Sequence, residues 1–159
     1  MECDSTTVNV GAYCSIGSGV TALSYPQHRK DWVSTFPFPS SDHGWPEAAG
    51  IGGTFAGQKH DITIGSDVWI GSDVVLLAGA DIGDGAVIGS RSLVAGHIEP
   101  YSIAVGNPCR GIKYRFTREQ IDQLMAIHWW TWEREKIVTF LPLLCSTNVD
   151  AFIKAAKNG

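Results

Sequence analysis

The sequence predicts an all-β solenoid, a parallel β-helix, and two features of its middle third predict it. Aliphatic residues recur every six positions from Ile64 to Val94, and glycine directly follows four of them. Neither an amphipathic helix nor a simple strand has a period of six, whereas a solenoid stacks one aliphatic residue per short repeat. Glycine then serves the corner between strands, where a side chain would crowd the turn. The aliphatic positions are Ile64, Ile70, Leu76, Ile82, Ile88 and Val94.

The same rhythm divides the chain into parts. Residues 8–23 carry it first, with Val10, Ile16 and Ala22 in register, and it resumes over residues 62–104. A solenoid buries its aliphatic residues only between stacked repeats, so both stretches are expected in one unit. The predicted units are residues 1–116, with a long excursion loop over 24–61, and residues 117–159.

The excursion is rich in aromatic residues and prolines. A loop of this length inside a compact domain is usually functional or disordered. Its content of Trp32, Phe36, Phe38 and Trp45 is too aromatic for a disordered linker. We therefore expect an ordered binding loop.

A helical cap is predicted after the repeats. Thr117 and Gln120 have the T-x-x-Q spacing of a capping box, and apolar residues follow at helical spacing. A second helix is expected over residues 132–141, ended by Pro142, and a third over residues 149–157. Since solenoids need capped ends, these helices are expected to cover the C-terminal coil.

The N-terminal side of the first coil has no predicted cap. The repeats begin almost directly, which leaves a strand edge that would invite pairing. Two expectations stay open: a neighbouring subunit covers this edge, or a natural N-terminal segment precedes the sequence.

Composition and charge argue against several classes of function. The 159 residues carry a formal net charge of −4, so no basic surface predicts binding to nucleic acid or to an anionic membrane. No apolar run resembles a signal peptide or reaches the length of a transmembrane helix. The four cysteines lack CxxC spacing, which favours reduced thiols in a cytoplasmic protein and argues against a zinc site.

Three stretches are similar to motifs of one family. They are residues 28–38 (HRKDWVSTFPF), residues 64–71 (IGSDVWIG) and residues 106–113 (GNPCRGIK). Together with the repeats, they make the chain resemble the hexapeptide-repeat acyltransferases. Within that family it looks most like the xenobiotic O-acetyltransferase branch, which acts on chloramphenicol and streptogramins.

The resemblance implies a left-handed β-helix of triangular cross-section, assembled as a homotrimer with active sites between subunits. Its handedness comes from the resemblance alone, because left-handed crossovers are the exception in proteins. Three six-residue repeats make a coil of 18 residues. Residues 18 apart, such as Ser72 and Ser90, would then stack at about the 4.8 Å spacing of neighbouring strands.

The implied reaction moves an acetyl group from acetyl-coenzyme A to an alcohol, and it needs a base for the hydroxyl proton. His28 is the candidate base, because a neutral imidazole accepts a proton near pH 7 and the resemblance places it at the family's catalytic position. The alternative is a solvated loop histidine beside Arg29 and Lys30. His43, in the same loop, either contacts the acceptor or is exposed at the surface. The remaining histidines are expected to be structural or exposed: His60, His97 and His128.

Acetyl-coenzyme A is expected in a groove of small residues and free amides along one corner of the coils. By resemblance, Arg110 and Lys113 match basic residues that contact the nucleotide phosphates, arginine as a fork and lysine as a point charge. The alternative for this pair is a solvated surface strand. The expected cofactor-binding residues are Ser72, Ser90, Ala95, Gly96, Arg110 and Lys113.

The acceptor side departs from the family. Trp32, Phe36 and Phe38 are expected to wall a pocket for a bulky alcohol, or else to pack the loop onto the coils. Relatives usually carry several dozen residues before the first matched repeat, where this chain has about nine, and residues 24–27 replace a Gly- and Asn-containing run. The acceptor therefore stays open among chloramphenicol, a streptogramin and a sugar hydroxyl.

Two rival functions were weighed against this one. A truncated, non-catalytic repeat protein would keep the fold as a binding or assembly module. A zinc-dependent carbonic anhydrase on the same scaffold would need three histidines around a metal, and residues 64–94 contain none. The sequence thus predicts an acetyl-coenzyme A-dependent O-acetyltransferase without a metal.

Overall fold

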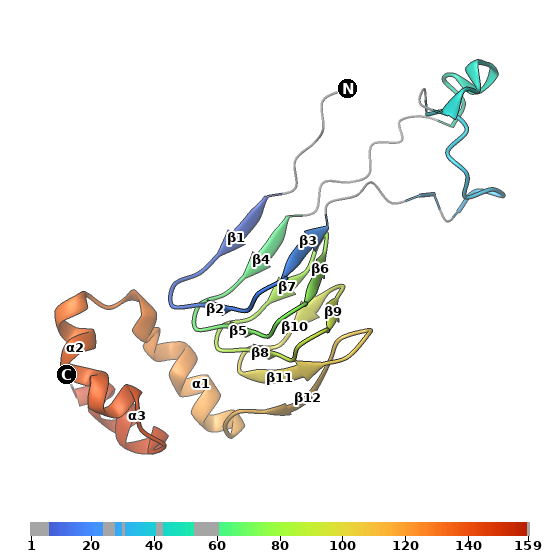
Figure 1. Ribbon diagram of the computed structural model, residues 1–159. Coiled ribbons are helices and arrows are strands. Elements are labelled where there is room, and N and C mark those ends of the chain that lie inside the picture. The colour runs from blue at the N-terminus through green and yellow to red at the C-terminus, as the bar shows by residue number, and fades with distance from the viewer. Residues whose placement is uncertain (1–6, 24–27, 30, 41–42, 53–60, 159) are drawn as a thin grey trace.

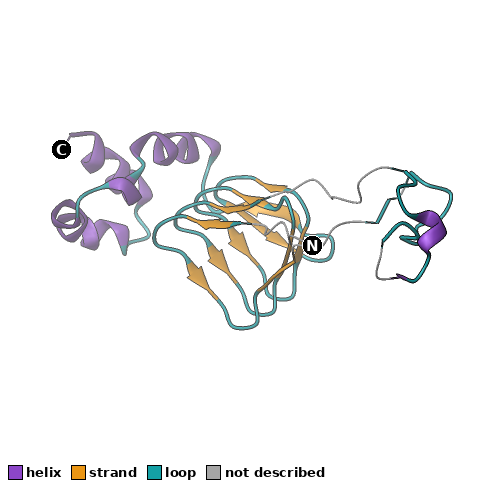
Figure 2. Cartoon of the chain, turned by 90° about the horizontal axis from the view of Figure 1, so that it is seen from above, coloured by secondary structure: helices purple, strands orange, loops and turns teal. Residues whose placement is uncertain are grey.

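The computed structural model describes residues 7–23, 28–29, 31–40, 43–52 and 61–158 of the chain. Short strands are stacked in successive coils at its centre (Figure 1). Three helices lie along one side of the coils, and the described part of the excursion projects from the opposite side (Figures 1 and 2).

The strands form three sheets, and each of the first three turns of the chain adds one strand to each sheet in the same order. The last turn adds β10 and β11 to two of the sheets, and β12 then pairs with β11. The sheet orders are β1-β4-β7-β10, β12-β11-β8-β5-β2 and β3-β6-β9, and all pairs are parallel except β11 with β12. The strands are β1 (Val8–Val10), β2 (Ser15–Ile16), β3 (Thr21–Leu23), β4 (Ile62–Ile64), β5 (Trp69–Ile70), β6 (Val75–Leu77), β7 (Asp81–Ile82), β8 (Val87–Ile88), β9 (Leu93–Val94), β10 (His97–Ile98), β11 (Ser102–Val105) and β12 (Arg110–Tyr114).

The strand register confirms the predicted stacking. Ile64 pairs with Ile82, 18 residues further along the chain, and Ile82 pairs with Ile98 after a shorter coil of 16 residues. Val10 pairs with Ile64 although 54 residues separate them. The excursion is therefore inserted at a corner without changing the register of the coils on either side.

The core lies inside the coils, as the six-residue rhythm predicts. The six aliphatic positions from Ile64 to Val94 are each at most 3% exposed. Their glycines sit at close approaches between coils: a Cβ on Gly71 would lie 2.6 Å from the backbone nitrogen of Ser90. Val10 and Ile16 are each 48% exposed, because the described residues place no coil before the first one.

One corner of the coils carries left-handed backbone in every turn. Tyr13, Asp67, Gly85 and Tyr101 have φ values of 60°, 56°, 69° and 55° and stack from the first coil to the last. The amide of Asp67 donates to the carbonyl of Ala12 at 2.9 Å, which ties the first coil to the second. We call these four residues the aromatic corner.

The helices are α1 (Arg118–Ile127), α2 (Arg134–Leu144) and α3 (Val149–Asn158). The capping box is confirmed, since the amide of Gln120 donates to the Thr117 hydroxyl and the amide of Thr117 donates to the Gln120 side chain. The prediction that Pro142 ends the second helix is wrong, because α2 continues to Leu144. Proline removes one donor near the helix end, while the following Leu143 and Leu144 pack against the helical core.

The helices pack against the aromatic corner rather than across the end of the coils. Trp129 contacts Tyr13 of the first coil with ring centroids 5.1 Å apart, and Phe116 contacts Tyr101 of the last coil at 5.8 Å. The free edge of β11 is paired by β12 instead. Of the helices in the described part of the chain, none is long and apolar enough to cross a membrane.

Candidate functional site

The candidate base His28 lies in the excursion with its ring exposed. Its Nδ1 is 2.7 Å from the carbonyl oxygen of Thr35. A carbonyl can only accept, so the neutral ring that makes this bond carries its proton on Nδ1, which leaves Nε2 with the free lone pair. This partner cannot be predicted from the sequence, because the contact is to the backbone and any residue type at position 35 would supply it.

Arg29 and Asp31, which follow closely after His28, neutralise each other's charge. The Arg29 guanidinium donates to both carboxylate oxygens of Asp31, with Nε 2.7 Å from Oδ1, and lies over the Trp32 ring. The hydrogen bond from Arg29 lowers the pKa of Asp31 to about 2. Asp31 thus has a defined partner, and that partner is Arg29.

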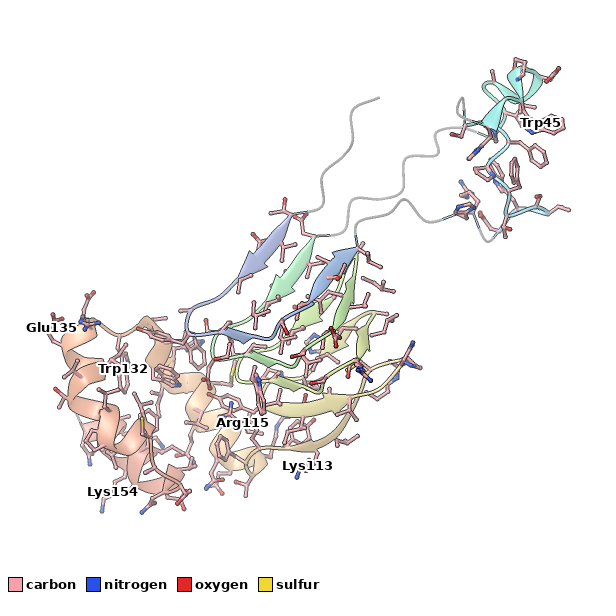
Figure 3. All side chains as sticks on the ribbon, viewed as in Figure 1. Trp45, Lys113, Arg115, Trp132, Glu135 and Lys154 are labelled. Atoms are coloured by element: carbon pink, nitrogen blue, oxygen red, sulfur yellow. The ribbon has the colours of Figure 1, made fainter. Side chains whose placement is uncertain are left out.

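The aromatic side chains of the excursion contact one another. The ring centroids of Phe36 and Phe38 are 4.7 Å apart, and those of Phe38 and Trp45 are 5.3 Å apart in an edge-to-face arrangement. Phe36 is still 43% exposed. Figure 3 shows Trp45 at the outer part of the excursion, far from Lys113 on the coils. The cluster therefore presents apolar surface away from the coils of its own chain.

The structure divides the expected small residues of the cofactor groove between two corners. Ser72 and Ser90 follow β5 and β8, and they stack as predicted, since the amide of Arg91 donates to the Ser72 carbonyl at 2.9 Å. Ala95 and Gly96 follow β9 at a different corner. The excursion leaves from that second corner, after β3. Among the described residues, none outside the immediate chain neighbours of Gly96 has an atom within 4 Å of a Cβ added there.

Arg110 and Lys113 form a third group on β12. Both are exposed, and both line a cleft of about 490 Å³ with His97 and Glu99. His97 is held by Asp81, with Nδ1 2.7 Å from the carboxylate. A cleft of this volume is in the range of small-molecule sites. The six expected residues thus lie at two corners of the coils and on β12.

Comparisons with known proteins agree with this architecture. A family model described as "Bacterial transferase hexapeptide (six repeats)" matches residues 61–96. A chloramphenicol acetyltransferase from Klebsiella aerogenes is 48% identical over 143 residues, which are 88% of this chain and 67% of that protein. A probable macrolide acetyltransferase from Lysinibacillus sphaericus is 40% identical over 86% of this chain and 76% of its own length.

A solved structure supports the same assignment. A galactoside acetyltransferase in complex with coenzyme A superposes with a TM-score of 0.51 and is 32% identical. That match covers 74% of this chain and 50% of the solved chain. The present chain therefore spans about two thirds of the first relative and half of this structure. It belongs to the hexapeptide-repeat acetyltransferase family, in the branch that contains chloramphenicol acetyltransferases.

Proposed function

We propose that this protein transfers an acetyl group from acetyl-coenzyme A to a hydroxyl of an antibiotic such as chloramphenicol or a streptogramin. The 48% identity to a chloramphenicol acetyltransferase over 88% of the chain is the observation that carries the proposal. The coenzyme A complex of the galactoside acetyltransferase supports the choice of donor. That relative also makes a sugar hydroxyl the second candidate acceptor.

In the proposed reaction, Nε2 of His28 accepts the proton of the acceptor hydroxyl. The oxygen attacks the thioester carbonyl, and the developing oxyanion is stabilised by backbone amides at a coil corner. The carbon–sulfur bond then breaks, and the protonated imidazole returns its proton to the departing thiolate. The products are the acetyl ester and free coenzyme A, and His28 regains its neutral form.

We infer further that the coils form a left-handed prism and that the protein is a homotrimer with active sites between subunits. The position of the excursion supports this assembly, because the excursion with His28 projects away from the coils of its own chain (Figure 1). In this arrangement Ser72, Ser90 and the Ala95–Gly96 backbone line the acetyl-coenzyme A groove. Arg110 and Lys113 hold the nucleotide phosphates. Trp32, Phe36 and Phe38 contact the acceptor.

The test is acceptor-dependent release of thiol from acetyl-coenzyme A, with chloramphenicol, a group A streptogramin and galactosides as acceptors. Removing a general base typically lowers turnover about 10²- to 10⁴-fold, and this loss is expected for His28→Ala. His128→Asn, which changes an exposed histidine on the helical side of the coils and keeps a residue type that tolerates the left-handed backbone there, is the control. Acceptor-dependent thiol release that persists in His28→Ala would disprove the role of His28 as general base. If the protein binds acetyl-coenzyme A but releases no thiol with any of the acceptors, a non-catalytic binding module is favoured instead.

A further inference from the structure

The cleft beside β12 contains a histidine between two carboxylates, in addition to the two cations proposed to hold phosphate. His97 and Glu99 both line this cleft. Nδ1 of His97 lies 2.7 Å from the carboxylate of Asp81, which pairs with it across β7 and β10. Nε2 of the same ring lies 3.7 Å from the Glu99 carboxylate. Both ring nitrogens of His97 therefore face carboxylate oxygens.

The two cations of the cleft lie on the same face of β12. Arg110 and Lys113 pair with Val105 and Ile103 of β11, because the register between the strands shifts by one residue. Val105 and Ile103 are two residues apart, and side chains two apart on a strand point to the same side of a sheet. None of the ion pairs among the described residues includes Arg110 or Lys113. Both charges are therefore available to an anion.

The charge that Glu99 contributes to the cleft depends on the form of His97. A carboxylate repels phosphate, so Glu99 opposes the two cations unless it is neutralised. The neutral His97 ring that donates from Nδ1 to Asp81 has only a lone pair on Nε2 and leaves the charge of Glu99 in place. The protonated ring carries a proton on both nitrogens and forms an ion pair with each carboxylate. Histidine side chains change between these two forms in the range of pH 5 to 8.

We propose that protonated His97 is a positioning residue of the donor site, which neutralises Glu99 so that the cations on β12 bind the phosphates of coenzyme A. This inference rests on the proposed function, which supplies the phosphates. His97 contacts carboxylates rather than the ligand, so it acts through Glu99 and takes no part in proton transfer. The charged groups that face its ring are Asp81 and Glu99, and the cations that share its cleft are Arg110 and Lys113.

Binding of coenzyme A to the full chain, measured by isothermal titration calorimetry at low ionic strength, tests the role of His97. At about pH 6, His97→Gln is expected to weaken binding about three- to fivefold, as loss of a partly exposed ion pair does. At about pH 8.5 both proteins should bind equally, because the wild-type ring is then neutral. The phosphates of coenzyme A also titrate, but this effect is common to both proteins and cancels in the ratio of their affinities. His128→Asn, on the helical side of the coils, is the control and should match wild type at both pH values.

A double variant separates the charge of His97 from its packing. Glu99→Gln removes the carboxylate at nearly constant size, so His97→Gln/Glu99→Gln is expected to bind coenzyme A within about twofold of wild type at about pH 6. A purely structural role of His97 would leave the double variant as weak as His97→Gln. No recovery in the double variant, or a loss in His97→Gln that is absent or is the same at both pH values, would overturn this inference alone. Failure of coenzyme A to bind to wild type would overturn the proposed function together with it.

Discussion

The carboxyl group of Asp67 is subject to opposing influences. Burial between the coils and the helices raises its pKa, whereas the neighbouring Arg115 acts to lower it, and the net shift is upward. The folded protein therefore holds this proton more tightly than the unfolded chain, whose aspartates titrate near pH 4. The resulting contribution to stability is fully present below about pH 4 and is lost as the pH rises through the folded pKa.

Replacing Asp67 by asparagine tests the direction of this pH dependence of stability. The difference in free energy of unfolding, wild type minus Asp67→Asn, is expected to fall as the pH rises above about 4 and then to level off. Urea unfolding at a series of pH values measures it. Asparagine tolerates the φ of 56° at this position, and Asp73→Asn, at φ 59° on another corner, controls for the backbone. A difference that rises with pH would contradict the burial argument.

Lys113 tests the proposed phosphate contact. Lys113→Gln is expected to raise the KM for acetyl-coenzyme A about tenfold, because one charge-assisted hydrogen bond is lost. The KM for acetyl-pantetheine, which lacks the nucleotide and its phosphates, should stay unchanged. Lys154→Gln on α3, away from the cleft, is the charge-matched control (Figure 3). Equal losses for both donors would place Lys113 outside the phosphate site.

The residue types in the sequence predicted which side chains belong to the candidate site, but they did not predict the contacts that orient those side chains. The motif after His28 identified the candidate base, yet the contact that fixes its tautomer is to the backbone of Thr35, where sequence carries no signal. Asp31 had several partners open to it in sequence, and only the folded excursion selects Arg29. Thus a motif indicates which residue types are present for the reaction, while the orientation of their side chains depends on backbone geometry that the motif does not show.

The corners of the coils depend on glycine for steric reasons. At Gly71, which has ordinary backbone angles, a Cβ would lie 2.6 Å from the nitrogen and side-chain oxygen of Ser90. Gly71→Ala is therefore expected to cost about 1–3 kcal/mol in urea unfolding, as overpacking of a tight contact does. A Cβ at Gly96 meets nothing within 4 Å in the part of the chain that the structure describes, so Gly96→Ala is expected to be near neutral. Similar costs at both positions would contradict the argument from close contact between coils, because Gly→Ala without a clash lowers the entropy of the unfolded chain and so tends to stabilise the protein.

The secondary-structure elements show where sequence patterns suffice. The six-residue rhythm predicted the strands from Ile64 to Val94 correctly, because the aliphatic residue of each repeat is buried inside the coils. The 18-residue stacking that the resemblance implied holds up to the last coil, which is 16 residues long. The rhythm did not predict where the helices dock. That position depends on Tyr13 and Tyr101, whose left-handed backbone turns them toward Trp129 and Phe116. Such contacts join segments far apart in sequence and leave no periodic signal.

The whole molecule separates the groups that one reaction would need. The excursion carries His28 away from the coils, while Arg110 and Lys113 lie on β12 beside the last coil (Figures 1 and 3). The proposed chemistry requires base and cofactor to meet at one acceptor hydroxyl. A homotrimer resolves this separation if the excursion of one subunit reaches the cofactor groove of the next.

Subunit complementation tests this arrangement. His28→Ala and the double variant Arg110→Glu/Lys113→Glu are each expected to be inactive at low acetyl-coenzyme A concentration. Co-expressed with different affinity tags and purified through both, mixed trimers should regain roughly a third of wild-type turnover, since cyclic symmetry leaves one intact site in three. Trimers of His28→Ala carrying both tags control for residual activity. If doubly purified mixed oligomers stay inactive, His28 and the phosphate-binding residues act within one chain, and the excursion must fold back onto its own coils.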